Sequence, residues 1–191
     1  MEAILKLDTA LFHVINGRLT APFLDVFMPF ITEKSNFVFI ILLGIVFVLL
    51  KGRRRDIRGL VLVIMVVLVG DLLGATLKNV FMRARPCHAL EDVRLLVGCG
   101  GAYAFPSNHA VNIFSACVFL STRYSRYTPV FLAIAVSVAY SRVYVGVHYP
   151  LDVLGGAVLG TLCAFVFSEA DKRYFQAAIN YARKKREDIE V

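Results

Sequence analysis

Five long apolar runs, separated by short polar segments, set the pattern of this chain. They cover residues 35–50, 59–80, 109–120, 129–147 and 151–168. Each run is near, or extendable to, the ~20 residues that an α-helix needs to cross the ~30 Å apolar core of a bilayer. The pattern therefore predicts an all-α fold, an integral membrane helical bundle of about five transmembrane helices.

The amino-terminal residues 1–17 have a mixed pattern instead of a continuous apolar run. Apolar Leu5 and Leu11 are interleaved with charged Lys6 and Asp8. A helix of this kind is too short and too polar to span a membrane, so we expect it to lie in the interface. Residues 20–33 carry two prolines and are expected to form a short helical segment that leads into the first span.

Composition supports a membrane protein built as one domain. The chain has 191 residues, of which 58% are hydrophobic, and its mean hydropathy is +0.69. Soluble domains contain about 45–50% apolar residues. Residues 1–17 carry no basic start and no small-residue cleavage site, so no cleavable signal is expected. The four cysteines are too few for a disulfide scaffold.

The net charge of +7 would suggest nucleic acid as a partner in a soluble protein. Here the basic residues cluster in segments between apolar runs, which indicates membrane topology instead. Thirteen of the 21 Lys and Arg residues lie in the segments 51–58, 121–128 and 169–191. With five spans these segments share one side, and the positive-inside rule places that side in the cytoplasm. Residues 169–191 are then a basic cytoplasmic tail. The amino terminus, the 81–107 loop and the 147–151 turn lie on the opposite, outer face.

Eight polar residues gather at the outer ends of the predicted spans: Lys78, Arg85, Ser107, Asn108, His109, Arg142, His148 and Asp152. An ionisable residue at the centre of a transmembrane helix costs about 2.5–3.5 kcal/mol on insertion scales, so such a concentration indicates function. Lysine and arginine bind multiply charged phosphates, and a helix amino terminus adds free N–H groups. The set has the composition of a phosphate site.

Two histidines in this set can divide the work of phosphoryl transfer. Pro150 is suited to the first position of a helix, which leaves His148 just outside it and lets Asp152 reach one ring nitrogen. A carboxylate so placed orients the ring and stabilises its charged form, so His148 is a candidate nucleophile. His109 is suited to protonating the leaving oxygen and then activating water.

Other features of the chain carry weaker predictions. Three nearby cations oppose a divalent ion, so we expect no metal and no other cofactor. Cys87 and Cys99 share the outer loop, where a disulfide is expected if that loop faces an oxidising compartment. Gly156 and Gly160 form a Gly-x-x-x-Gly that suits close helix packing within the chain, with dimerisation as the alternative.

Three further polar residues lie near the candidate site. Asp71 lies about two helical turns before Lys78, where it could join an internal polar network. His88 and Arg83 lie in the outer loop. They are expected to be solvated there, with contact to a lipid headgroup as the alternative.

Three motifs at fixed spacing add a resemblance to these observations. Lys78 is followed after six residues by Arg85-Pro86, the segment 106–109 reads Pro-Ser-Asn-His, and Ser141-Arg142 precedes His148 and Asp152. In this order and spacing the chain resembles the type 2 phosphatidic acid phosphatases, integral membrane lipid phosphatases. Asn108 is the one departure, because glycine is usual there.

The resemblance implies a role for each motif residue and a reaction without a metal. Lys78, Arg85 and Arg142 would bind the phosphate with Ser107 and the backbone near Asn108. His148 would form a phosphohistidine, with Asp152 orienting it and His109 as acid and base.

The expected substrate is a lipid phosphate held in the membrane, and the sequence indicates no obligatory protein partner. Undecaprenyl diphosphate is the first choice, at the periplasmic face of a bacterial inner membrane. The alternatives are phosphatidylglycerol phosphate, lipid A phosphate, phosphate transfer to a second lipid, and a non-catalytic lipid-binding or transport role.

Overall fold

The computed structural model describes residues 2–187, with side chains described to residue 177. Its regular elements are helices, in agreement with the predicted fold class: α1 (Glu2–His13), η1 (Val14–Arg18), α2 (Pro22–Thr32), α3 (Ser35–Lys51), α4 (Arg54–Phe81), α5 (Pro86–Ala89), α6 (Asn108–Arg123), η2 (Ser125–Tyr127), α7 (Thr128–Tyr144) and α8 (Pro150–Glu187). The five predicted apolar runs fall on α3, α4, α6, α7 and the first half of α8.

Fewer helices than five meet the length needed for an independent membrane span. Among the described residues, α4 and the Pro150–Ala177 part of α8 are long and apolar enough. Helices α2 and α3 form a third candidate if they are taken together across their 50° bend. Helices α6 and α7 have 16 and 17 residues, which corresponds to about 24–26 Å at 1.5 Å per residue. The predicted all-helical membrane fold holds, but the count of five spans is not confirmed.

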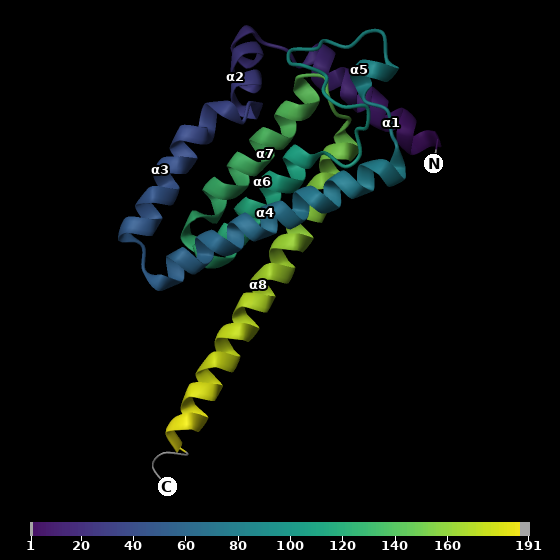
Figure 1. Ribbon diagram of the computed structural model, residues 1–191. Coiled ribbons are helices and arrows are strands. Elements are labelled where there is room, and N and C mark those ends of the chain that lie inside the picture. The colour runs from purple at the N-terminus through teal and green to yellow at the C-terminus, as the bar shows by residue number, and fades with distance from the viewer. Residues whose placement is uncertain (1, 188–191) are drawn as a thin grey trace.

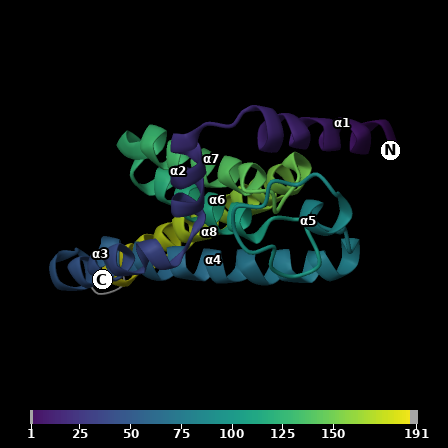
Figure 2. The same ribbon diagram turned by 90° about the horizontal axis from the view of Figure 1, so that it is seen from above.

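Helix α6 lies at the centre of the bundle and packs against α4, α7 and α8 (Figures 1 and 2). The closest approach is to α8, where glycines remove the side chains that would separate the helices. A Cβ on Gly156 would lie 2.6 Å from the Ser107 carbonyl oxygen, and one on Gly160 would lie 2.9 Å from the Ser115 nitrogen. The Gly-x-x-x-Gly therefore serves packing within the chain, which places the starts of α6 and α8 side by side.

Helix α3 stands at the edge of the bundle and buries none of its residues (Figure 1). Phe39, Phe47 and Leu50 are 71%, 67% and 75% exposed. A helix that is apolar on all sides and exposed on the surface of the protein is suited to contact lipid. This is the expected behaviour of the first predicted span.

Helix α1, with η1 after it, buries polar side chains against the bundle and leaves several leucines exposed. Asp8 and Asn16 are 2% and 1% exposed, whereas Leu7 and Leu11 are 60% and 45% exposed. Asp8 faces the protein because its carboxylate accepts hydrogen bonds from Arg83 and from the Leu151 backbone N–H. Helix α1 therefore docks on the bundle through polar contacts and through Phe12, which packs in an apolar cluster with Tyr149, and it presents leucines outward.

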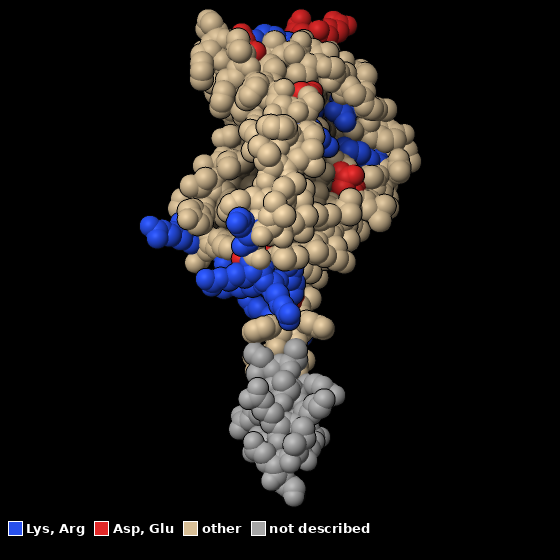
Figure 3. Space-filling model, turned by 60° about the vertical axis from the view of Figure 1, so that its left-hand side comes forward, with Lys and Arg blue, Asp and Glu red and all other residues tan. Residues whose placement is uncertain are grey.

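Lysine and arginine side chains gather at the end of the bundle opposite α1 and α2 (Figure 3). Lys51, Arg53, Arg54 and Arg55 are exposed there, at the turn between α3 and α4. The predicted tail is not a separate segment, because α8 continues through it to Glu187 without a break (Figure 1). The side chains of its basic residues Arg183, Lys184, Lys185 and Arg186 lie outside the described part.

Candidate active site

A cavity of about 440 Å³ opens at the end of the bundle where α4 and α7 finish and α6 and α8 begin. Its lining comes from these helix ends, from the bend between α2 and α3, and from the 82–107 loop: Thr32, Glu33, Lys34, Lys78, Arg85, Val97, Gly98, Cys99, Gly100, Asn108, His109, Arg142 and His148. Six of the eight predicted site residues thus line one cavity. The other two, Ser107 and Asp152, are fully buried just behind it.

His148 lies in the turn between α7 and α8, where the backbone folds back on itself. Gly146 makes this turn possible, because its φ of +89° suits glycine, and a Cβ there would lie 2.8 Å from the Arg94 carbonyl oxygen. Pro150 then begins α8, as predicted. The His148 ring is 2% exposed and faces the cavity from this turn.

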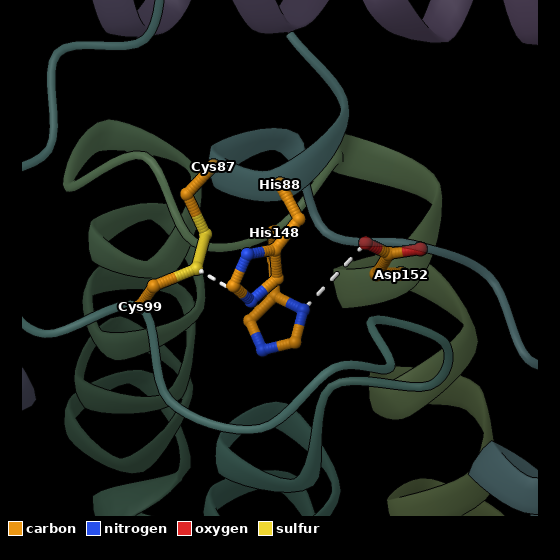
Figure 4. Close-up of a disulfide and its surroundings, with 5 residues drawn as sticks. All are labelled: Cys87, His88, Cys99, His148 and Asp152. Atoms are coloured by element: carbon orange, nitrogen blue, oxygen red, sulfur yellow. Dashed lines mark hydrogen bonds and ion pairs between the residues drawn. A yellow bond between two sulfur atoms is a disulfide. The ribbon is translucent and has the colours of Figure 1, made fainter.

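Asp152 faces the His148 ring from the first turn of α8 (Figure 4). Its Oδ2 lies 3.5 Å from His148 Nδ1 and accepts a 2.8 Å hydrogen bond from the Tyr149 backbone N–H. Nδ1 has no hydrogen-bond partner among the described residues. The carboxylate is therefore placed to meet an N–H at Nδ1, with the contact still longer than a strong hydrogen bond.

The surroundings of His148 favour its neutral form. Burial, together with the positive charges of Arg85, Arg142 and Lys78, holds the pKa of His148 well below its ordinary value. A neutral imidazole has a free nitrogen lone pair, which nucleophilic attack requires.

Two arginines in the cavity keep unused hydrogen-bonding capacity. Arg142 is 7% exposed and donates a 2.5 Å hydrogen bond from Nη1 to the Thr32 hydroxyl. The Nε atoms of Arg142 and Arg85 are buried without a partner among the described residues. Burial also lowers the pKa of Arg85. Buried guanidinium N–H groups without acceptors are matched to an incoming oxyanion.

Lys78 differs from the two arginines, because its ammonium contacts a neighbouring segment of the chain. Nζ donates to the carbonyl oxygens of Tyr103, Ala104 and Pro106 at 3.3, 3.1 and 2.6 Å. Lys78 therefore holds the segment that leads into α6, in addition to lining the cavity.

The amino terminus of α6 is tied directly to that of α8. The Ser107 backbone N–H donates to the Asp152 carbonyl oxygen at 2.9 Å. The Ser107 hydroxyl is buried without a partner among the described residues. His109, in the first turn of α6, is half-buried and lines the same cavity as His148.

The unusual Asn108 is accommodated by helix α4. Its side-chain amide donates to Asp71 Oδ1 at 3.1 Å, and Asn112 donates to the same oxygen at 2.8 Å. This is the internal polar network predicted for Asp71. Gly74 leaves the necessary space, because a Cβ there would lie 2.8 Å from Asn108 Oδ1.

A disulfide joins Cys87 to Cys99, with 6.2 Å between the Cα atoms (Figure 4). It closes a loop over residues 87–99, and the next residue, Gly100, lies beside the Arg85 guanidinium. His88 Nε2 lies 3.2 Å from Cys99 Sγ. These three residues form the single group of candidate metal ligands within the described part of the chain, and its two sulfurs are bonded to each other. A reaction without metal stays a prediction.

Several residues that contribute to the site were not predicted from the sequence. The bend between α2 and α3 brings Thr32, Glu33 and Lys34 to the cavity. The polar run that these residues start, just before the first apolar run, was the available signal. Arg83, expected to be solvated or at a headgroup, instead donates to Asp152 Oδ1 at 2.7 Å and to Asp8 Oδ2 at 2.6 Å. That expectation was wrong because Arg83 is drawn to two buried carboxylates.

Comparison with known proteins agrees with this geometry. Residues 58–175 match the PAP2 superfamily. Lipid A 4'-phosphatase of Porphyromonas gingivalis is 32% identical over 170 residues, covering 85% of this chain and 72% of that protein. Undecaprenyl-diphosphatase of Sulfolobus acidocaldarius is 32% identical over 167 residues, covering 86% and 79%.

A solved structure extends the agreement to the fold. The PAP2-type phosphatidylglycerolphosphate phosphatase of Bacillus subtilis superposes with a TM-score of 0.73 at 27% identity, over 91% of this chain and 88% of that one. The matched segment contains all three motifs and the helix ends that build the cavity. The chain therefore belongs to the PAP2 superfamily of membrane phosphatases.

Proposed function

We propose that this membrane phosphatase hydrolyses undecaprenyl diphosphate to the monophosphate through a phosphohistidine on His148. One observation carries the proposal: two histidines and four cationic side chains line the same cavity, with a buried carboxylate behind one histidine. Cations hold the phosphate, and the histidines supply a nucleophile and a proton donor. The family membership supports the reaction class.

In the first step the Nε2 lone pair of His148 attacks the terminal phosphorus. Nδ1 faces Asp152, so Nε2 is the nitrogen left for attack. An N–P bond forms, and the bond from phosphorus to the bridging oxygen breaks. The negative charge of the bound diphosphate favours the protonated form of His109, which gives its proton to that oxygen as undecaprenyl phosphate leaves. Arg85 and Arg142 stabilise the charge on the transferring phosphoryl group.

In the second step water attacks the phosphohistidine. His109, now neutral, takes a proton from the water as the new O–P bond forms. The N–P bond breaks, inorganic phosphate leaves, and both histidines return to their starting state. Asp152 stabilises the charge that His148 carries while it is phosphorylated.

The choice of a diphosphate rests on Lys34. A monoester phosphate group can be held by Lys78, Arg85 and Arg142, as the motifs imply. Lys34 adds a fourth cation from the α2–α3 bend, on the rim of the cavity, where a second phosphate group would lie. A cavity of about 440 Å³ leaves room for two such groups.

Lipid A is the second candidate substrate, because a lipid A 4'-phosphatase matches 85% of this chain. Phosphatidylglycerol phosphate is the third, through the similar fold of a phosphatase for that lipid. Both are phosphomonoesters, and neither places a second phosphate next to the reacting one.

We further propose that the site faces the periplasm of a bacterial inner membrane and that the carboxyl end is cytoplasmic. The concentration of Lys and Arg at the opposite end supports this orientation (Figure 3). The disulfide beside the cavity supports an oxidising compartment on that side.

The test is phosphate release by purified protein in EDTA from undecaprenyl diphosphate, phosphatidylglycerol phosphate and lipid A. We expect the diphosphate to give the highest kcat/KM and His148→Ala to be inactive on all three. Lys34→Met should lower kcat/KM for the diphosphate more than for the two monoesters.

Three results would count against the proposal. A higher kcat/KM on lipid A or on phosphatidylglycerol phosphate would reassign the substrate. Loss of activity in EDTA that zinc or magnesium restores would exclude the metal-free reaction. Phosphate that appears on an added lipid acceptor, with none released to water, would replace hydrolysis by transfer.

A further inference from the structure

One arginine that is not among the fixed positions of the three motifs joins the candidate catalytic carboxylate to the amino-terminal helix. Arg83 Nη1 donates to Asp152 Oδ1 at 2.7 Å, and Nη2 of the same guanidinium donates to Asp8 Oδ2 at 2.6 Å. Its Cζ lies 4.0 Å from the centre of the Tyr149 ring. Both carboxylates are almost fully buried, at 1% and 0% side-chain exposure.

These contacts fix the rotation of the Asp152 carboxylate. Oδ1 is held by Arg83 and Oδ2 by the Tyr149 N–H, so the second oxygen is left facing the His148 ring. A guanidinium is planar and donates in fixed directions, whereas an ammonium does not. Stacking on Tyr149 further restricts the plane in which Arg83 can lie.

Asp8 holds the arginine from the other side. Its second oxygen accepts a 2.9 Å hydrogen bond from the Leu151 N–H, in the first turn of α8. Asp8 therefore fixes Arg83 relative to the helix that carries Asp152. Its burial costs free energy unless it is paired, and the arginine and the N–H supply that pairing.

Helix α1 faces the bundle with one carboxylate as well as with an apolar side chain. It buries Asp8 together with Phe12 and leaves Ile4, Leu7 and Leu11 exposed. An apolar packing role alone would place leucines inward and the aspartate outward.

We propose that Arg83 and Asp8 are positioning residues that hold Asp152 in the orientation His148 needs, so that α1 is part of the catalytic apparatus. The proposal rests on the proposed role of His148 as nucleophile. It does not depend on which lipid is the substrate.

The test measures kcat, KM and the inhibition constant of inorganic phosphate for Arg83→Met, Arg83→Lys, Asp8→Asn and the Arg83→Met/Asp8→Asn double variant. Hydrolysis of p-nitrophenyl phosphate is the assay, so a wrong lipid assignment leaves this test standing. The control is Arg94→Met in the same loop, because Arg94 also pairs with a carboxylate, Asp25 at 2.7 Å, and lies over a tyrosine.

We expect Arg83→Met to lower kcat by about 10²-fold, the typical cost of a small misplacement of catalytic groups. The inhibition constant of phosphate should stay within about twofold, since the arginines of the cavity are untouched. Arg83→Lys should recover only part of the loss. Asp8→Asn should lower kcat less than Arg83→Met and have no further effect in the double variant. Arg94→Met should keep kcat.

Two outcomes would overturn the proposal. Retention of kcat within about twofold by Arg83→Met would show that Asp152 needs no arginine. Equal losses of kcat and phosphate affinity, shared by Arg94→Met and accompanied by a lower unfolding midpoint, would show that Arg83 only stabilises the fold.

Discussion

The two ends of the helical bundle use arginine and aspartate in opposite proportions. At the cavity end one arginine, Arg83, is shared by Asp8 and Asp152. At the other end one carboxylate, Asp171 on α8, is shared by Arg58 and Arg123. In one cluster the negative charge is in excess, and in the other the positive charge is.

The arginines around each cluster also differ between the two ends of the bundle. At the cavity end the Nε atoms of Arg85 and Arg142 are buried and have no partner among the described residues. Asp152, the carboxylate whose charge acts on Arg85, already accepts a hydrogen bond from Arg83, so Arg85 stays available to a ligand. At the opposite end Asp171 pairs with both Arg58 and Arg123, although the Nε of Arg123 is likewise buried without a partner among the described residues. We expect this pairing to serve stability.

The largest expected effect comes from a substitution at the cavity end, which should change activity without lowering stability. Arg142→Gln should lower kcat/KM by about 10²–10³-fold, because it removes a charge that stabilises the transferring phosphoryl group. The unfolding midpoint should stay the same or rise, since Arg142 is a buried cation beside Arg85. A kinetic and thermal unfolding series on purified protein checks this. A variant that is both unstable and normally active per folded molecule would break the comparison.

At the end opposite the cavity we expect a loss of stability without a loss of activity. Asp171→Asn leaves two arginines without their carboxylate and should lower the free energy of unfolding by about 1–3 kcal/mol. Activity of the folded protein should be unchanged. Glu169→Gln is the matched control, because Glu169 is 52% exposed and its ion pairs among the described residues are with exposed Lys172 and Arg173. Such surface pairs contribute about 0–1 kcal/mol, so the control should be nearly silent in chemical denaturation.

The pH profile tests whether the unpaired cations act on their neighbour. Burial and the charges of Arg85, Arg142 and Lys78 lower the pKa of His148, so the neutral nucleophile persists as the pH falls. A histidine of ordinary pKa, about 6.5, would be roughly 90% protonated at pH 5.5. The acid limb of kcat/KM, which reports the free enzyme, should therefore lie below pH 6.5. An acid limb above that pH would mean that the cations are screened from His148.

The smallest expected effect concerns the polar contact between α4 and α6. Asn108→Gly removes a hydrogen bond to Asp71 and should cost about 0.5–1.5 kcal/mol of stability. Activity should stay within about threefold, a change in barrier below 1 kcal/mol. A larger loss of kcat/KM would show that this side chain contacts the phosphate.

Much of the fold follows from the apolar pattern, because helices of a membrane protein must satisfy their own backbone groups. The runs 59–80 and 129–147 correspond closely to α4 and α7. The number of spans does not follow, since α6 and α7 are short and α2 joins α3 through a bend. Whether a short apolar helix crosses the membrane depends on its neighbours, which the pattern of one run does not contain.

The candidate site, like the fold, could be predicted from the sequence only in part. The spacing of the motifs predicted that Lys78, His109 and His148 share one site. This prediction did not require knowledge of the residues around them in the fold. Arg83 and Asp8 escaped prediction because each looks like an ordinary surface charge until its partner, 75 residues away in sequence, is placed beside it. The signal was weak but present: Asp8, Phe12 and Asn16 recur every four residues, which puts them on one face of a helix.

The hydrogen bond from Leu151 to Asp8 joins residues 143 positions apart. During synthesis the first helix emerges long before α8, so its carboxylate has neither the Leu151 N–H nor the Arg83–Asp152 pair to meet until almost the whole bundle has been made. Docking of α1 is thus a late event in assembly. If Arg83 and Asp8 position Asp152 as proposed, the enzyme becomes active only after this last docking step.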